Sequence, residues 1–71
     1  MRRQPVTSSA IDSVGYDPDV AVLELEFTSG DIYRYYAVPN AVHAHLMVAP
    51  SPGRYFLEHI RDTYPSEQIR E

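Results

Sequence analysis

The sequence contains no cysteine, no lysine and no tryptophan, and it has only three glycines among 71 residues. Without cysteine there is no disulfide framework and no thiolate metal site, so the chain must be stabilised by its own small core. No run approaches the roughly 20 apolar residues of a membrane-spanning helix. The basic pair Arg2-Arg3 is not followed by the apolar run of a signal peptide. We therefore expect one soluble, cytoplasmic domain that does not bind a membrane.

Positive charge is also scarce in this chain. Six arginines face ten acidic residues, which gives a formal net charge of −4. Non-specific affinity for nucleic acid comes from basic side chains that neutralise phosphates and release counterions. The balance argues against a broad nucleic-acid-binding face, so any contact with RNA is expected to be local.

Residues 20–38 predict two strands joined by a short turn. Leu23, Leu25 and Phe27 alternate with other residues at the period of a strand that buries one face. The run after the turn is rich in β-branched and aromatic residues, which favour a pleated surface. The loop at 28–30 ends in a glycine, which can take the positive φ of a bulged turn. A β-hairpin is therefore the central element that the sequence predicts.

A three-residue loop also fixes which residues of the hairpin face each other. The predicted pairs are Phe27 with Asp31, Leu25 with Tyr33, Glu24 with Arg34, and Leu23 with Tyr35. This register places leucines and tyrosines on one face and an opposite-charge pair on the other. A slip by one residue would set a leucine against an arginine, which is less favourable.

The second half of the chain predicts two helices. The first begins at Pro39, because proline suits the first helical position, and Pro50 ends it. The second begins at Ser51 and Pro52, with the serine as the N-cap. Pro65 closes this second helix.

The predicted fold is α+β, a three-stranded antiparallel meander followed by two helices packed on one face, in the order β-β-β-α-α. The strand before the hairpin spans roughly 10–16, and Gly15 within it indicates a bulge or a close backbone approach. A single domain is expected over 6–65. Residues 1–5 and 66–71 are expected to be flexible tails.

No arrangement of side chains in the sequence predicts catalysis. His43 and His45 are two residues apart, so on a helix they point to nearly opposite sides and do not share a metal. Glu24 and Glu26 are expected on the solvent face of a strand, where carboxylates make poor general acids. We therefore expect a chain that is not an enzyme and that holds no metal and no cofactor.

The six tyrosines are the most unusual feature of the composition. Alternation places Tyr33 and Tyr35 on the same face as the leucines of the hairpin, where their rings would supply core. The alternative interpretation is an aromatic platform on which bases stack. We favour the core interpretation because it follows from the strand period.

The opposite face of the same strand is expected to remain uncovered, because both helices pack on the other side. An exposed strip on it is the better candidate for contacting a partner. The candidate binding surface consists of Ile32, Arg34 and Tyr36, with Arg54 of the second helix as a further contact.

Several short motifs follow one another in a particular order along the chain. They are Ser8-Ser9, Ile11, Gly15-Tyr16-Asp17, Leu23-x-Leu25-x-Phe27, Gly30, Tyr33-x-Tyr35, Val38-Pro39, Ala49-x-Ser51-x-Gly53 and Tyr55-Phe56. Together they resemble the KTSC domain, over roughly residues 6–64. That family is a small module that occurs alone in bacterial proteins and at the C-terminus of some lysyl-tRNA synthetases.

The resemblance implies a module of unestablished function, with an RNA-binding role suggested by the attachment to synthetases. The family signature falls on Tyr33, Tyr35, Gly53, Tyr55 and Phe56. The chain departs from the family pattern at two positions, with His43 where members often carry an aromatic residue and Leu57 where they often carry asparagine.

Two functions from different classes therefore stay open. One is a non-catalytic RNA-binding accessory domain, as the resemblance implies. The other is a protein-interaction module, including a homo-oligomer, that uses the uncovered sheet face or an edge strand.

Overall fold

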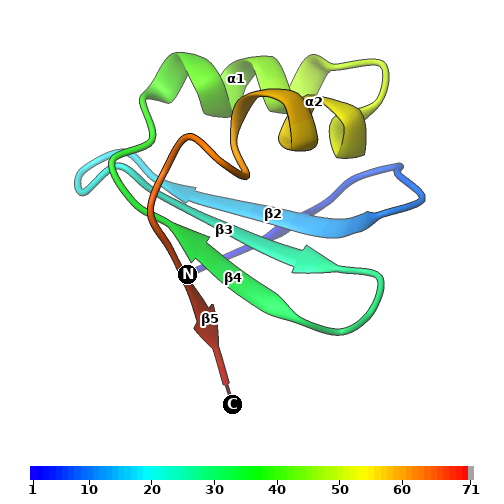
Figure 1. Ribbon diagram of the computed structural model, residues 1–71, viewed down its shortest axis with the longest axis horizontal. Helices are drawn as coiled ribbons and strands as arrows, with labels where there is room; N and C mark the ends of the chain where they lie inside the picture. The colour runs from blue at the N-terminus through cyan, green and yellow to red at the C-terminus, as the bar shows by residue number, and fades with distance from the viewer. Residues whose placement is uncertain (71) are drawn as a thin grey trace.

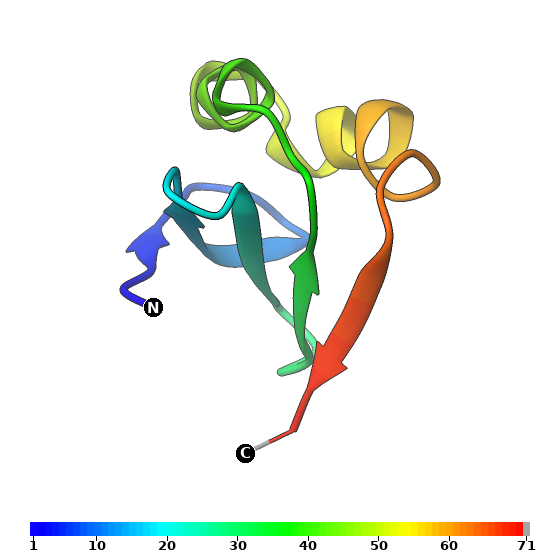
Figure 2. The same cartoon turned by 90° about the vertical axis from the view of Figure 1, so that its left-hand side faces the viewer.

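The computed structural model describes residues 1–70 and shows two layers, an antiparallel sheet and a pair of helices above it (Figure 1). The chain forms β1 (Gln4–Pro5), β2 (Ile11–Asp17), β3 (Val22–Phe27), β4 (Ile32–Tyr35), α1 (Asn40–Val48), α2 (Pro52–His59) and β5 (Ser66–Ile69). The strands lie side by side in the order β1-β2-β3-β4-β5. Both helices cover the same face, with α2 towards the β5 side (Figure 2).

The β3–β4 hairpin has the predicted register. Its paired residues are Leu23 with Tyr35, Glu24 with Arg34, Leu25 with Tyr33 and Glu26 with Ile32. The backbone N–H of Phe27 donates to the carbonyl of Asp31 at 2.9 Å, which closes the predicted loop. Gly30 has a φ of 95°, the left-handed conformation that the turn requires.

β2 pairs with β3 along its whole length, as the sequence predicts. At Gly15 the reason for the glycine is a close approach, since a Cβ there would lie 2.9 Å from the carbonyl oxygen of Arg2. The bulge that was the other possibility at Gly15 lies elsewhere in β2, where the pairing register shifts between Ile11 and Ser13.

The predicted number of three strands is wrong, because both expected tails contribute a strand. In the first tail, Gln4 and Pro5 pair with Val14 and Ser13 of β2. Proline is tolerated there because an edge strand has one side on which no N–H is needed. In the last tail, Ser66–Ile69 pairs with β4 after the chain returns from α2. Glu71 of that tail lies outside the described residues.

Both helix starts and the end of α1 agree with the prolines, but the predicted end of the second helix at Pro65 is wrong. α2 ends at His59, because Ile60 leaves the helical conformation with a φ of −120° and the chain continues in turns before Pro65. α1 follows Pro39, and Ala49, which precedes Pro50, is already extended, with a ψ of 139°. At the start of α2, the Ser51 hydroxyl accepts a hydrogen bond from the backbone N–H of Arg54 at 3.3 Å. None of the helices within residues 1–70 is long and apolar enough to cross a membrane.

The core lies between the sheet and the helices and combines the inward residues of both layers. It consists of Ile11, Val14, Leu23, Leu25, Tyr35, Val38, Leu46, Phe56 and Ile60. The predicted facing of the tyrosines is confirmed: Tyr35 is 4% exposed, and Tyr33, partly buried, packs against the core.

The two neighbouring tyrosines at the end of β4 should therefore differ in their effect on stability. Tyr35→Ala removes a buried ring and should lower the free energy of unfolding by about 3 kcal/mol. Tyr36→Ala removes one partly exposed hydrogen bond and should cost less than about 1 kcal/mol. Urea unfolding followed by circular dichroism measures both. Equal losses would contradict the facing of the strand.

Candidate functional site

The strip that the sequence proposed on the helix-free face is already engaged within the protein. Ile32 was expected to be exposed, but it is only 8% exposed where it pairs with Glu26 on one side and Ile69 on the other. Arg34 donates from Nε to Glu24 at 2.8 Å. The hydroxyl of Tyr36 donates to a carboxylate of β5, Glu67, at 2.9 Å. A phosphate would have to displace carboxylates to reach these side chains.

Glu24 is also unlike the expected solvent-facing carboxylate, since it is only 3% exposed. It lies between two arginines, with Arg3 Nη1 at 2.5 Å and Arg34 Nε at 2.8 Å. Burial by itself raises the pKa of Glu24, but the hydrogen bonds and positive charges of Arg34 and Arg3 outweigh it and hold the pKa below its ordinary value. We call Arg3, Glu24 and Arg34 the charge row.

Arg54 does not join this strip. It lies on α2 in the other layer, 78% exposed, and faces Glu58 one turn along the helix at 3.7 Å. An exposed pair of this kind contributes little to stability. The four residues of the predicted surface are therefore not brought together.

The residues that the structure does gather are the aromatic rings on the helix side. Phe27 and Tyr33 have ring centroids 5.9 Å apart, and Tyr33 and Tyr35 are 6.5 Å apart. Phe56 of α2 completes a ring of four aromatic side chains in which each contacts two others. Its ring centroid lies 5.5 Å from that of Tyr35 and 5.2 Å from that of Phe27. Three of the four contacts are edge-to-face, the arrangement that aromatic quadrupoles favour.

These four rings form one wall of an open hollow of about 600 Å³, which we call the aromatic hollow. Its rim is polar and comes from Ser9 before β2, the 28–31 turn with Asp31, Arg61 after α2, and Ser66 at the start of β5. The close approach of α2 to the segment before β2 depends on Gly53, because a Cβ there would lie 3.1 Å from the Cβ of Ala10.

The tyrosine hydroxyls of the hollow are free within residues 1–70. Neither Tyr33 nor Tyr35 makes a side-chain hydrogen bond to another described residue, whereas Tyr16 donates to the carbonyl of Val38 at 2.6 Å. Burial raises the pKa of the Tyr35 hydroxyl, and the neighbouring Tyr33 raises it further, against the opposing effect of Arg61. Tyr35 is therefore a protonated donor at neutral pH.

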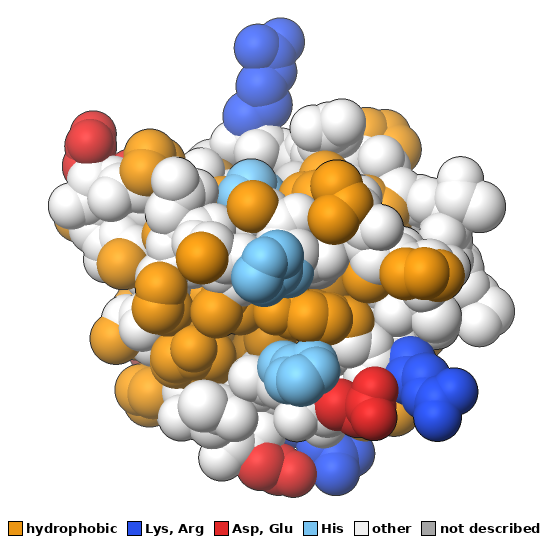
Figure 3. Space-filling model, turned by 90° about the horizontal axis from the view of Figure 1, so that it is seen from above, with side chains coloured by type: hydrophobic (Ala, Val, Ile, Leu, Met, Phe, Trp, Pro, Cys, Tyr) orange, Lys and Arg blue, Asp and Glu red, His pale blue; other side chains and the backbone are white. Residues whose placement is uncertain are grey.

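Tyr55, the remaining ring of the family signature, lies outside the aromatic hollow. It packs against His59, with ring centroids 4.5 Å apart, and against His45 at 6.4 Å. Seen from above, the histidines lie among hydrophobic side chains of the helix layer (Figure 3).

His43 is separate from that pair and stacks on Tyr16, with ring centroids 4.6 Å apart and planes 9° from parallel. Burial lowers the pKa of His43. The imidazole of His43 thus packs as an aromatic ring against the sheet. Among residues 1–70, no three His, Cys, Asp or Glu side chains are grouped to hold a metal ion.

Tyr33, Tyr35 and Phe56 of the hollow were singled out from the sequence. Phe27 and Arg61 were not expected to belong to a site with them. Phe27 shares the alternation of the leucines, so its face was predictable. Arg61 follows the end of α2, and only the packing of that helix brings it over β4.

Fold and site together define a small α+β domain in which two helices over an antiparallel sheet frame an aromatic hollow. The chain belongs to the KTSC domain family, whose model matches residues 7–64. β1 and β5, the two edge strands, lie outside the matched residues.

Similar proteins include single-domain chains and a much longer enzyme. An uncharacterised protein of Stutzerimonas stutzeri is 50% identical over 56 residues, which are 79% of each chain. A lysine–tRNA ligase of a Nostoc species is 43% identical over 61 residues, which are 86% of this chain and 11% of the ligase. The crystal structure of a KTSC domain protein from Yersinia pestis matches with a TM-score of 0.95 and 42% identity, and covers 97% of both chains.

The charge row predicts how stability depends on pH. The folded pKa of Glu24 is lowered from 4.5, so its stabilising effect is present above about pH 4.5 and is lost as pH falls through the folded pKa. Glu24→Gln should cost on the order of 1–3 kcal/mol at about pH 7. This difference from the native chain should shrink towards about pH 3 in urea unfolding. A difference that stays constant over this range would contradict the ionic role.

Proposed function

We propose that this chain is a non-catalytic RNA-binding module and that its aromatic hollow receives an unpaired base. The observation that carries the proposal is the combination of an aromatic wall, two tyrosine hydroxyls with no side-chain hydrogen bond to another residue within 1–70, and an arginine at the rim. Single-stranded RNA is bound through base stacking on aromatic side chains and through arginine contacts to the backbone.

The relatives support the same conclusion. Several proteins that share this domain are lysine–tRNA ligases, whose name assigns them tRNA as a substrate. A domain attached to such an enzyme and also present alone fits an accessory module better than a catalytic one. Tyr33, Tyr35 and Arg61 present hydrogen-bond donors to the hollow, which suits base edges and phosphates, and Asp31 adds one carboxylate to its rim.

The net charge of −4 limits how this binding can work. Stacking contributes about 1–3 kcal/mol per base without requiring positive charge. Arg61 lies 3.3 Å from the carboxylate of its neighbour Asp62, an exposed pair that contributes little and that a phosphate can displace more easily than the buried Glu24. This single arginine would neutralise about one phosphate, and each phosphate contact to a single strand contributes a slope of about −0.7 to the salt dependence. The proposed complex is therefore weakly salt-dependent, unlike binding by a basic patch.

A second candidate function, protein interaction through an edge strand, is favoured by the position of β5. This strand is the last of the sheet and pairs only with β4 among the described residues. An unpaired strand edge is a template for a further strand. Light scattering at high concentration tests the homo-oligomeric form, and a strictly monomeric chain would remove it.

The RNA proposal is tested with an unstructured RNA of about ten nucleotides, labelled and titrated at about 50 and 200 mM salt. Arg61→Ala should weaken binding roughly five- to tenfold, and Tyr33→Phe should weaken it less while keeping the ring. Arg54→Ala is the matched control because it removes the same charge from the far side of α2.

Two results would contradict the proposal. The first is that no RNA, including bulk tRNA, binds at the lower salt concentration. The second is an equal loss with Arg54→Ala and Arg61→Ala, because this would show attraction by overall charge rather than recognition in the aromatic hollow.

A further inference from the structure

The N-terminal arm, residues 1–5, is held to the sheet by very little strand pairing. β1 contributes two residues to a β2 strand of seven. Both are exposed, and one of them is a proline. Towards its amino end the arm leaves the edge of β2 and passes over Gly15, where the Arg2 carbonyl lies against the glycine. An arm with so few contacts belongs to the least stable part of a fold.

The side chain of Arg3, by contrast, sits in a built socket. Its Nε donates to the hydroxyl of Ser13 at 3.1 Å, and its Nη1 donates to Glu24 at 2.5 Å. Ser13 is 8% exposed and Glu24 is 3% exposed. Gly15 forms the floor beside them, since a Cβ at that position would also lie 3.1 Å from the Arg3 Cγ. We call Ser13, Gly15 and Glu24 the arginine socket.

The socket is oriented before any arginine enters it. The Ser13 hydroxyl gives its proton to Glu26 at 2.9 Å, which leaves its lone pairs to accept. One oxygen of Glu24 is taken by Arg34, which leaves the other oxygen free. Two fixed acceptors match the forked donors of a guanidinium, whereas the compact ammonium of lysine is a point charge.

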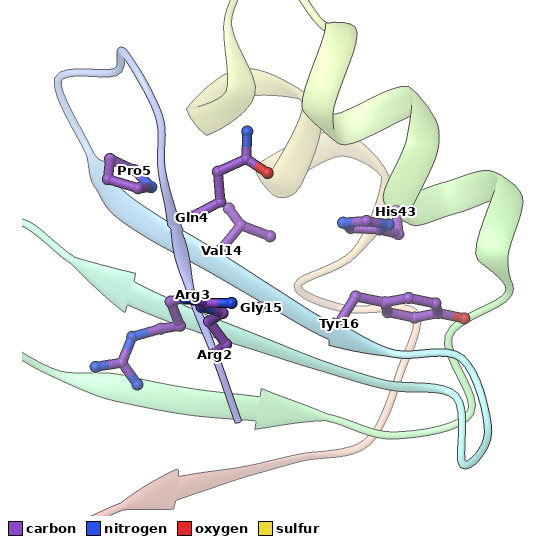
Figure 4. A pocket seen from close by; sticks show the side chains of 8 residues that line it. All are labelled: Arg2, Arg3, Gln4, Pro5, Val14, Gly15, Tyr16 and His43. Carbon is purple, nitrogen blue, oxygen red and sulfur yellow. The ribbon is translucent and has the colours of Figure 1, made fainter.

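There is also space along β2 for a segment that stays paired further than β1 does. An open hollow of about 440 Å³ lies beside Val14, Gly15 and Tyr16, between the arm and His43 of α1 (Figure 4). At Gly15 to Asp17 the arm is not paired with β2, although the strand continues there. A segment that followed the edge to its end would gain main-chain hydrogen bonds that the arm does not make.

We propose that the arginine socket and the adjoining edge of β2 form a binding site for an extended segment of another protein that carries arginine. In the free chain its own N-terminal arm occupies this site and competes with that segment. A flexible tether gives the arm a local concentration of the order of millimolar, so a partner must pair more residues of β2 to displace it. The site is independent of the aromatic hollow, which opens on the helix side.

A second copy of this chain is a weaker occupant. Exchange of arms between two copies would reproduce the contacts of the monomer, while association costs several kcal/mol of lost translational and rotational freedom. A partner segment that continues along Gly15–Asp17 adds contacts that exchange does not supply.

Two synthetic peptides test this proposal. The first has the sequence of residues 3–6, and the second adds two residues at its amino end, a valine and before it a threonine, which in the register of β1 would face Tyr16 and Asp17. They are titrated into the full ¹⁵N-labelled chain carrying Arg3→Lys, which weakens its own arm and keeps the charge. Amide shifts are expected at Ser13 to Asp17, and the longer peptide should bind at least fivefold more tightly.

The controls separate the socket from general attraction. Replacement of the arginine that corresponds to Arg3 by alanine in the longer peptide should reduce binding at least tenfold, as should Glu24→Gln in the chain. The native chain, whose arm competes, should bind the longer peptide at least fivefold more weakly than the Arg3→Lys chain. If the Glu24→Gln chain does not fold, the comparison of the arginine peptide with the alanine peptide tests the socket by itself.

Three results would overturn the proposal. One is the absence of shifts along β2 with either peptide at millimolar concentration in the Arg3→Lys chain. Another is equal binding of the arginine and alanine peptides. The third is a native chain that is dimeric by light scattering and becomes monomeric with Arg3→Ala, because this would assign the site to the arm of a second copy.

Discussion

The register of the β3–β4 hairpin determines the rest of the molecule. Because Leu23 faces Tyr35 and Leu25 faces Tyr33, the four side chains fall on one face, and α1 and α2 have an apolar surface to cover. The same register places Glu24 beside Arg34 on the other face. A shift by one residue would exchange the two faces, since side chains alternate along a strand. One pairing thus separates an aromatic core from an ionic surface.

The ionic surface then explains the position of the N-terminal arm. Glu24 is nearly inaccessible to solvent, and a buried carboxylate is costly unless its charge is paired and its oxygens are hydrogen-bonded. Arg34 satisfies one oxygen from the neighbouring strand. The other is satisfied by Arg3, which is 21 residues away in sequence. The arm therefore lies across the sheet because a charge in the central strand requires a second partner there.

This dependence on distant contacts marks the limit of prediction from the sequence. The hairpin, its register, both helix starts and the end of α1 follow from local rules, namely alternation, a glycine turn and prolines at helix ends. The end of α2 at His59 does not, because the chain turns six residues before Pro65. β1 and β5 do not, because two residues with a proline, or four polar-rich residues, have no period that a local pattern can reveal. The burial of Glu24 was missed for the same reason, since alternation assigns a face but not what covers it.

The candidate site was predictable to a similar degree. Sequence analysis assigned Tyr33 and Tyr35 to the inner face, and both do lie there. Core and binding surface were treated as alternatives, whereas the structure shows the same rings both in the core and at an open hollow. The rings of Phe27, Tyr33, Tyr35 and Phe56 pack against each other, and the Tyr35 ring is buried, yet the same group lines an open hollow. A tyrosine can serve both purposes because its ring is apolar and its hydroxyl is polar.

The two faces therefore have different chemistry and are suited to different partners. On the helix side the aromatic hollow is lined by rings, hydroxyls, Arg61 and one carboxylate, Asp31, and its rings and donors suit a base and a phosphate. On the opposite side the acceptors of Ser13 and Glu24 suit a guanidinium and would repel a phosphate. Because the sheet lies between them, occupation of one site leaves the other accessible. Under the two proposals, one domain of 71 residues would contact a nucleic acid on one face of the sheet and a protein on the other.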